Sequence, residues 1–264
     1  MLELREIYKT FNPGTINEKR ALNGVSLTLA DGDFVTVIGG NGAGKSTLLN
    51  AVAGTFPVDA GTIAIDGIDV TSLPEHKRAQ YIGRVFQDPM MGTAATMQIE
   101  ENLALAARRG KARGLKAGIT AREREEYREL LKILDLGLEE RLTAKVGLLS
   151  GGQRQALTLL MATMVPPKLL LLDEHTAALD PGTADKVLRL TREIVEGEGI
   201  TCLVITHNMK NALELGNRTL MMDDGRIVLD IGGEERKGLT VDDLLARFRA
   251  GAGKALDNDR ILLS

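Results

Sequence analysis

A glycine-rich run follows directly on a short apolar segment, and it constrains the fold more than any other part of the chain. The apolar segment is residues 34–38, and the run Gly39-Gly40-Asn41-Gly42-Ala43-Gly44-Lys45-Ser46 matches the pattern G-x-x-x-x-G-K-[ST]. Glycines let consecutive backbone N–H groups turn toward phosphate oxygens, and a helix that begins near Lys45 would present its positive end to the same oxygens. The sequence therefore predicts a strand, a phosphate-binding loop and a helix in succession.

Two side chains of this loop have the chemistry that phosphate binding requires. Lys45 would neutralise the β- and γ-phosphates of a nucleotide, and the Ser46 hydroxyl would ligate Mg²⁺. A fortuitous glycine-rich turn is the alternative. The strand expected before the loop and the helix expected after it favour the nucleotide site.

A second apolar run ends in two carboxylates. Residues Leu169–Leu172 are followed by Asp173 and Glu174, and a strand in an open α/β sheet delivers such residues to the crevice where ligands bind. Asp173 would hold Mg²⁺, mostly through the ion's hydration shell, and Glu174 would polarise an attacking water. Considered alone, an ordinary carboxylate pair at a strand end is an equal alternative.

A serine and two glycines precede a third apolar stretch, in the run Leu149-Ser150-Gly151-Gly152-Gln153. This run indicates the start of a helix, where Ser150 and Gly152 could offer hydrogen-bond donors to an anion. The alternative is that Ser150 serves only as the N-cap of the helix.

The order of apolar runs and helical stretches predicts an α/β fold with a parallel sheet. Residues 34–38, 169–172 and 202–205 are continuous apolar runs, typical of strands that are buried on both faces. Between the last two runs, Asp180 can cap a helix that begins at Pro181.

The middle of the chain, from about residue 97 to 164, shows helical patterns and no convincing strand. Thr120-Ala121-Arg122-Glu123 forms a capping box, and apolar residues follow it at helical spacing. We interpret this region as a helical subdomain inserted into the sheet domain. The elements expected after the sheet strands are a hairpin over residues 220–229, a helix over residues 240–248 and a mobile tail over residues 251–264.

The loop, the Leu149–Gln153 run and the acidic strand end together resemble the ATP-binding cassette family of transport ATPases, over residues 2–229. The Leu-Ser-Gly-Gly-Gln string is the family's own signature and is more specific than the phosphate loop. The resemblance implies a P-loop NTPase (RecA-like) fold, whose mostly parallel sheet core is joined by an N-terminal antiparallel β region and an inserted α-helical subdomain. It implies one domain over residues 1–250, with the sheet core in 1–88 and 166–250 and the helical subdomain in 89–165.

The resemblance also implies roles for individual residues. Gln87 resembles the glutamine that reaches Mg²⁺ and the attacking water, and His207 resembles the switch histidine that contacts the γ-phosphate. Asp180 resembles the aspartate that crosses a dimer interface, a role compatible with its N-cap role. The expected catalytic residues are Glu174, His207 and Gln87, the expected metal ligands are Ser46, Gln87 and Asp173, and the expected ATP-binding residues are Phe11, Gly39, Asn41, Gly42, Ala43, Gly44, Lys45, Ser46, Thr47, Ser150, Gly151, Gly152, Gln153 and Asp180.

Three aromatic or imidazole side chains leave alternatives open. Phe11 is expected to stack on adenine, because it lies before the strand that leads toward the phosphate loop. Tyr8 is its competitor, and a core role is an alternative for either. After Glu174 the family most often has proline, whereas this chain has His175. A surface substitution beside the site is the favoured interpretation of His175, and a metal ligand or a base is the alternative.

Composition excludes several classes of protein. Lys and Arg number 33 and Asp and Glu number 36, so the net charge of −3 argues against a general nucleic-acid binder. The single cysteine, Cys202, cannot form an internal disulfide, and its apolar surroundings indicate a buried thiol. One basic run is expected to be a solvated loop between helices rather than a nucleic-acid site; it contains Arg108, Arg109, Lys111, Arg113 and Lys116.

The resemblance implies an ATPase subunit that acts at the cytoplasmic face of the cell membrane. Two copies would enclose two ATP molecules, and a separate membrane permease and an extracytoplasmic solute-binding protein would be the further partners. The methionines of Pro89-Met90-Met91-Gly92 would suit contact with an inserted permease helix, unless both pack inside the subdomain. We expect import of an amino acid, of the aromatic type. The alternatives are an exporter, a lipid-extraction ATPase, or a cassette ATPase such as that of iron–sulfur cluster assembly.

Overall fold

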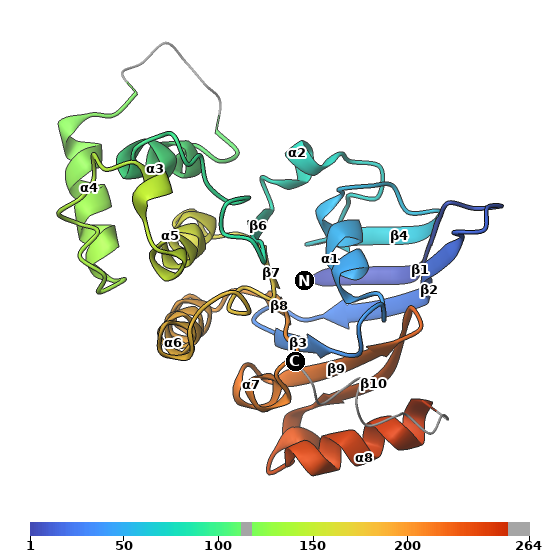
Figure 1. Cartoon of the computed structure of the whole chain (residues 1–264). Coiled ribbons are helices and arrows are strands. Elements are labelled where there is room, and N and C mark those ends of the chain that lie inside the picture. The colour runs from blue at the N-terminus through green and yellow to red at the C-terminus, as the bar shows by residue number, and fades with distance from the viewer. Residues whose placement is uncertain (112–117, 253–264) are drawn as a thin grey trace. The chain divides into compact units, whose positions relative to one another are not determined.

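The computed structural model describes residues 1–111 and 118–252, which form two compact units. The first unit comprises residues 1–78 and the chain from residue 199 onward, and the second comprises residues 79–198 (Figure 1). Arg113 and Lys116 of the basic run, and the tail expected over residues 251–264 beyond residue 252, lie outside the described residues. Within the described ranges, no helix combines the length and the apolar character that crossing a bilayer would require.

An antiparallel sheet opens the first unit. Its strand order is β2-β1-β4-β5, where β1 is Leu2–Phe11, β2 is Lys19–Leu29, β4 is Ala60–Ile65 and β5 is Ile68–Asp69. Each neighbouring pair runs antiparallel, and alternate residues such as Leu2, Leu4, Leu27 and Leu29 are buried. The expected N-terminal antiparallel region is therefore confirmed.

Parallel strands form the other sheet of the first unit. Strand β3 (Phe34–Ile38) pairs in parallel with β8 (Cys202–Ile205) and with β9 (Arg218–Asp223), and β10 (Arg226–Gly232) closes a hairpin with β9. All residues of β3 and β8 are buried, including Cys202. The continuous apolar runs are thus strands buried on both faces, as expected.

In the part of the first unit that the structure describes, four helices and a short 3₁₀ turn accompany the strands. They are α1 (Lys45–Ala53), α2 (Glu75–Arg78), α7 (Met209–Glu214), the 3₁₀ turn Gly233–Arg236 and α8 (Val241–Ala252). Helix α8 contributes Leu244 to a cluster with Ile38, Met221 and Ile231. The final helix therefore exists as expected, and it is longer than the sequence pattern indicated.

The second unit combines a parallel strand pair with helices. Strand β6 (Ile82–Val85) pairs in parallel with β7 (Leu169–Asp173). The helices are α3 (Ile99–Ala107), α4 (Ala121–Lys132), the 3₁₀ turn Val146–Leu148, α5 (Gly151–Thr163) and α6 (Pro181–Gly197). Figure 1 shows α3, α4 and α5 gathered together, in green to yellow. The inserted subdomain over residues 89–165 stays a prediction, because the unit extends over 79–198.

Helices α3 and α4 are joined by an ion pair between a buried carboxylate and an exposed guanidinium. Glu100 is 4% exposed, and Arg124 donates two hydrogen bonds to its carboxylate, from Nε at 2.6 Å and from Nη2 at 2.9 Å. These bonds outweigh the cost of burial and lower the pKa of Glu100. The predicted capping box is also present, because the Thr120 hydroxyl accepts from the N–H of Glu123 and the Glu123 carboxylate accepts from the N–H of Thr120.

Candidate functional site

The glycine-rich run forms the loop between β3 and α1 in the first unit. Gly44 is the N-cap of α1, with a φ of 103°, and Gly39 has a φ of 146°. A Cβ atom on Gly39 would lie 2.2 Å from the carbonyl oxygen of Met222, and one on Gly44 would lie 2.5 Å from that of Ala21. Because L side chains avoid these dihedrals and no space exists for a Cβ, glycine is required at both positions.

Lys45 lies at the centre of this loop. Its side chain is almost entirely buried, and its ammonium donates to the carbonyl oxygens of Gly39, at 2.8 Å, and Gly40, at 3.0 Å. Ser46 is exposed and Thr47 is half-buried at the start of α1. The loop therefore holds one positive charge beside the N-terminal end of a helix, which is the arrangement that binds phosphate.

His207 lies at the same edge of the parallel sheet as the phosphate loop. In the parallel pair β3–β8, Val37 is opposite Ile205, so Gly39 and His207 both follow two residues after these partners. Parallel strands deliver the residues after their carboxyl ends to one edge. The half-buried His207 precedes Asn208, the N-cap of α7.

The aromatic side chains of β1 differ in their surroundings. The Phe11 ring is half-buried and lies edge-on to Phe56, with ring centroids 5.3 Å apart. The ammonium of Lys9 lies 5.6 Å from the Phe11 centroid. Tyr8 is more exposed, and its hydroxyl donates to Glu6 at 3.2 Å. A base could reach the partly exposed Phe11 ring, so the expected stacking role stays a prediction.

Lys19 is a residue that the sequence pattern did not indicate. It lies opposite Phe11 in the β1–β2 pair, and its ammonium lies 3.1 Å from the position that a Cβ on Gly42 would occupy. A second cation, which is exposed whereas Lys45 is buried, therefore approaches the phosphate loop. No local motif marks Lys19, because only the strand register brings it there.

Two predicted site elements meet at the carboxyl edge of the strand pair in the second unit. Val85 is opposite Leu172 in the parallel pair β6–β7. Asp173, the last residue of β7, therefore lies at the same edge as Gln87 and Glu174, which follow the strands. Glu174 has a φ of 45°, in the left-handed region that non-glycine residues seldom adopt. Such a residue persists only where the surrounding structure holds it, and these residues cluster at functional sites.

The favoured interpretation of His175 as a surface residue is wrong. Its side chain is 3% exposed, and its Nε2 lies 3.0 Å from the Thr191 hydroxyl on α6. Burial lowers the pKa of His175 to about 4, because it removes water from the charged form. The described residues also contain no cluster of three or more His, Cys, Asp or Glu side chains that could hold a metal ion. His175 is a neutral, anchored side chain beside Glu174.

The signature run Ser150–Gln153 forms the start of α5. The Ser150 hydroxyl accepts from the N–H of Gln153, and the Gln153 side chain accepts from the N–H of Ser150, both at 3.2 Å. Ser150 is therefore an N-cap, as its alternative interpretation predicted. Asp180 caps α6 in the same way, accepting from the N–H of Thr183 at 3.1 Å. The Thr183 side chain and backbone lower the pKa of Asp180.

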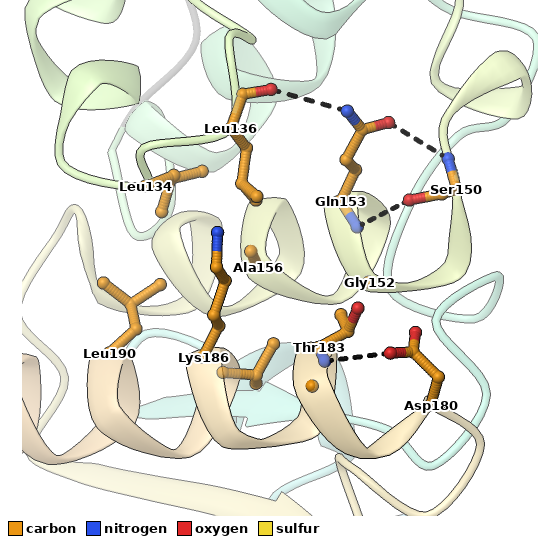
Figure 2. Close-up of a pocket in the computed structure, with 12 residues that line it drawn as sticks. Leu134, Leu136, Ser150, Gly152, Gln153, Ala156, Asp180, Thr183, Lys186 and Leu190 are labelled. Carbon is orange, nitrogen blue, oxygen red and sulfur yellow. Dashed lines mark hydrogen bonds between the residues drawn. The ribbon is translucent and has the colours of Figure 1, made fainter.

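A cavity of about 410 Å³ lies between α5 and α6 (Figure 2). Its polar end contains Ser150, Gln153 and Asp180, and its apolar end contains leucines of the segment before α5 and of α6. In Figure 2 the Lys186 side chain rises from α6 toward Leu134 and Leu136. The signature run and the α6 cap thus line one concave surface of the second unit.

Two polar side chains of α5 donate hydrogen bonds to the backbone of neighbouring segments. Neither of them was assigned a role from the sequence. Arg154 donates to the carbonyl oxygens of Gly147 and Leu149, both at 3.2 Å, and so holds the backbone before Ser150. Gln155 is fully buried and donates to the carbonyl oxygen of Phe86 at 3.2 Å, next to Gln87. A polar residue facing the inside of an otherwise apolar helix is the signal that could have indicated Gln155.

The residues expected to hold Mg²⁺ have the donor chemistry that this ion prefers. Ser46, Asp173 and Gln87 offer hydroxyl, carboxylate and amide oxygens, and Mg²⁺ takes oxygen ligands and keeps several waters when it binds with nucleotide phosphates. One carboxylate in the set suits such a site better than a dense acidic cluster would. The residues present therefore fit Mg²⁺.

Comparisons with known proteins agree with this geometry. A family model described as ABC transporter matches residues 22–177. The chain is 44% identical to the tyrosine transport ATP-binding protein of Clostridioides difficile (strain R20291), over 94% of this chain and 98% of that protein. It is 38% identical to the lipoprotein-releasing system ATP-binding protein LolD 1 of Caulobacter vibrioides, over 88% of this chain and 98% of that protein.

A solved structure shows the same likeness in three dimensions. The ATP-binding cassette MJ0796, in a dimeric post-hydrolysis state bound to ADP and Pi, has a TM-score of 0.75 and 31% identity to this chain. The match covers 90% of this chain and 100% of that cassette. The expected P-loop NTPase fold is therefore confirmed, and the chain belongs to the ABC transporter family, as an ATP-binding subunit that hydrolyses ATP.

Proposed function

We propose that this subunit powers the import of an amino acid, of the aromatic type, through a separate membrane permease. The observation that carries the proposal is the 44% identity to a tyrosine transport ATP-binding protein along nearly the whole length of both chains. The lipoprotein-releasing relative matches over similar shares at 38%, so release of a lipid-linked protein is the second candidate. In the proposed complex, a solute-binding protein delivers the amino acid and the subunit works at the cytoplasmic face of the membrane.

In the first unit, the proposed roles concern the nucleotide. Lys45 neutralises the β- and γ-phosphates, the loop N–H groups bind the phosphate oxygens, and the Ser46 hydroxyl is a Mg²⁺ ligand. The position of Lys45 supports this role, because its ammonium lies in the glycine-rich loop at the N-terminal end of α1, where an anion is favoured. His207 contacts the γ-phosphate, and Phe11 stacks on the adenine.

In the second unit, the proposed roles concern the attacking water. Glu174 accepts a hydrogen bond from that water and orients it, Asp173 holds Mg²⁺ through its hydration shell, and Gln87 is a further Mg²⁺ ligand and contacts the water. The bound Mg²⁺ supplies positive charge that stabilises the phosphoryl group in transfer. Their common position at one strand edge supports the assignment. Catalysis then rests mainly on positioning and electrostatics.

We infer further that two copies of the chain enclose two ATP molecules. The residues proposed to face the ATP of the other copy are the signature run Ser150–Gln153 and Asp180. The exposure of Ser150 and Asp180 beside one cavity supports this role, since a second chain could reach them. The dimeric state of the MJ0796 cassette provides independent support.

Replacing Glu174 by Gln tests the proposed chemistry. The variant should bind ATP normally, because the phosphate loop is intact, and should lose nearly all turnover, because the amide cannot orient the water as the carboxylate does. Trapped ATP should also hold two copies together. Phosphate release and size-exclusion chromatography with ATP measure both effects, with Glu198→Gln, on an exposed carboxylate, as the matched control. Turnover at the wild-type rate would refute the role of Glu174.

Reconstitution of the full transporter tests the proposed import. The tagged subunit is purified from detergent-solubilised membranes with its permease, and the complex is placed in liposomes with the solute-binding protein outside. ATP should drive accumulation of radiolabelled tyrosine or phenylalanine, and the Glu174→Gln complex should not support it. Accumulation of neither amino acid, or ATP-driven release of a lipoprotein from the vesicles, would contradict the proposal.

A further inference from the structure

His175 follows the proposed catalytic residue Glu174 directly in the sequence, and its imidazole ring is buried. Its side chain is 3% exposed, and its environment favours the neutral imidazole. The ring follows directly on Glu174, and its contact is with α6 rather than with any charged group that the structure shows. Nothing in the phosphate chemistry uses this residue, so its position requires another explanation.

The hydrogen-bond network determines which atom donates between His175 and Thr191. The Thr191 hydroxyl donates its single proton to the carbonyl oxygen of Val187, at 2.8 Å. A carbonyl oxygen can only accept, so the hydroxyl must accept from the ring. His175 therefore carries its proton on Nε2 and donates it to Thr191, across a distance of 3.0 Å. The ring, the hydroxyl and the α6 backbone form one chain of directed bonds.

The backbone at Glu174 needs such an anchor. Its φ of 45° is a conformation that a non-glycine residue leaves readily unless its neighbours hold it. The carbonyl oxygen of Glu174 accepts from the N–H of Ala177 at 2.9 Å, which holds the turn on one side. The buried ring of the next residue holds it on the other side.

We propose that His175 is a positioning residue, which holds the Glu174 carboxylate in its working direction through the bond to Thr191. This inference rests on the proposed role of Glu174 in orienting the attacking water. Loss of the bond would let the peptide between Glu174 and His175 relax toward a commoner conformation. The carboxylate would then move while the nucleotide-binding loop stayed unchanged.

Paired substitutions test the bond from both ends. His175→Leu removes the donor and Thr191→Val removes the acceptor, whereas His175→Gln keeps an N–H donor and Thr191→Ser keeps the hydroxyl. The first two variants should each lower kcat about tenfold or more, as expected when a reacting group is misplaced, with KM for ATP unchanged. The double variant should be no slower than either single variant. His175→Gln and Thr191→Ser should retain most of the wild-type kcat.

Measurements in the Glu174→Gln variant distinguish the positioning role of His175 from the catalytic role of Glu174, on which it rests. If Glu174→Gln itself keeps the wild-type kcat, the catalytic role of Glu174 fails. If Glu174→Gln is inactive and His175→Leu does not lower its residual rate further, the effect passes through Glu174 as proposed. A wild-type kcat in both His175→Leu and Thr191→Val, or a rise in KM alone, would overturn the positioning role. If His175→Leu does not fold, the kcat values of Thr191→Val and Thr191→Ser still test the positioning role.

Discussion

At the scale of the residue, Lys45 shows how a buried ammonium is held in place at a predicted phosphate site. A buried ammonium is costly unless polar groups surround it, and here two carbonyl oxygens of its own loop do so. A carbonyl oxygen carries only a partial negative charge, so these two bonds hold the ammonium in the loop without neutralising it. The motif predicted this residue from sequence, because the loop's dihedrals and its lysine are encoded within eight consecutive positions.

Phe11 and Tyr8 offer a prediction about the base. Phe11→Ala should weaken ATP binding by about 1–3 kcal/mol, the usual contribution of a base stacked on an aromatic ring, whereas Tyr8→Ala should leave it unchanged. The reason is that the Tyr8 hydroxyl is engaged by Glu6, while the Phe11 ring is partly open. Titration calorimetry with ATP measures both variants. A loss confined to Tyr8→Ala would assign the stacking role to Tyr8.

The positions of His175 and Lys19 could not be predicted from the residues next to them in the sequence. The sequence places His175 next to a charged, polar segment, which favours the surface, yet the structure buries it against Thr191, sixteen positions further on. Lys19 approaches Gly42 only because of its register in the β1–β2 pair. Both outcomes depend on which distant element packs nearby, and no local pattern carries that information.

At the scale of the element, α5 and α6 approach each other closely at Gly152. A Cβ atom at this position would lie 2.0 Å from the Thr183 methyl group. The contact explains why a glycine stands in the second position of α5, where an alanine would otherwise favour the helix. The signature run therefore serves packing as well as the proposed contact with nucleotide.

Alanine substitutions measure this contact. Gly152→Ala should lower the free energy of unfolding by about 1–3 kcal/mol, the usual cost of overpacking. Gly182→Ala is the matched control, because Gly182 is the second residue of α6 and a Cβ there meets only Asp180, at 3.7 Å. Thr183→Ser should relieve the loss by removing the methyl group. Urea unfolding decides, and equal stability of the two alanine variants would refute the close contact.

Most elements were predictable, for physical reasons that are local. The Asp180 cap followed by Pro181 and the Thr120–Glu123 capping box each mark a helix start within four residues, and both helices begin as expected. The buried strands were recognisable because burial on both faces leaves them almost wholly apolar, with Thr36 as the buried polar residue of β3. The extent of α8 was not, since Gly251 favours a helix end before it, whereas the helix continues through Gly251 to Ala252.

At the scale of the whole molecule, exposed methionines indicate where a partner would bind. Met90 is 49% exposed and Met91 is 67% exposed, so the alternative in which both pack inside the subdomain is wrong. Flexible thioether side chains adapt to apolar surfaces of differing shape. We therefore keep the segment that follows Gln87 as the proposed contact with a permease helix.

A charge at Met91 tests this surface. Met91→Glu should lower co-purification of the permease from detergent-solubilised membranes, because a buried carboxylate at an interface without a partner is costly. The ATPase rate of the isolated subunit should not change. Ile133→Glu, at another exposed apolar position of the second unit with 56% exposure, is the control. Undiminished co-purification of the Met91 variant would exclude this segment from the interface.

Cys202 gives the molecule a property that is useful to the experimenter. It is the single cysteine of the chain, it is fully buried in β8, and burial raises the pKa of its thiol. Thiol reagents act on the thiolate, so Cys202 of the folded protein should not react with maleimides. It should react only when local unfolding exposes β8. No cysteine therefore needs to be removed before site-specific labelling: a cysteine introduced at an exposed site should react alone in the folded protein. Slow labelling of Cys202 would then report unfolding of the first unit.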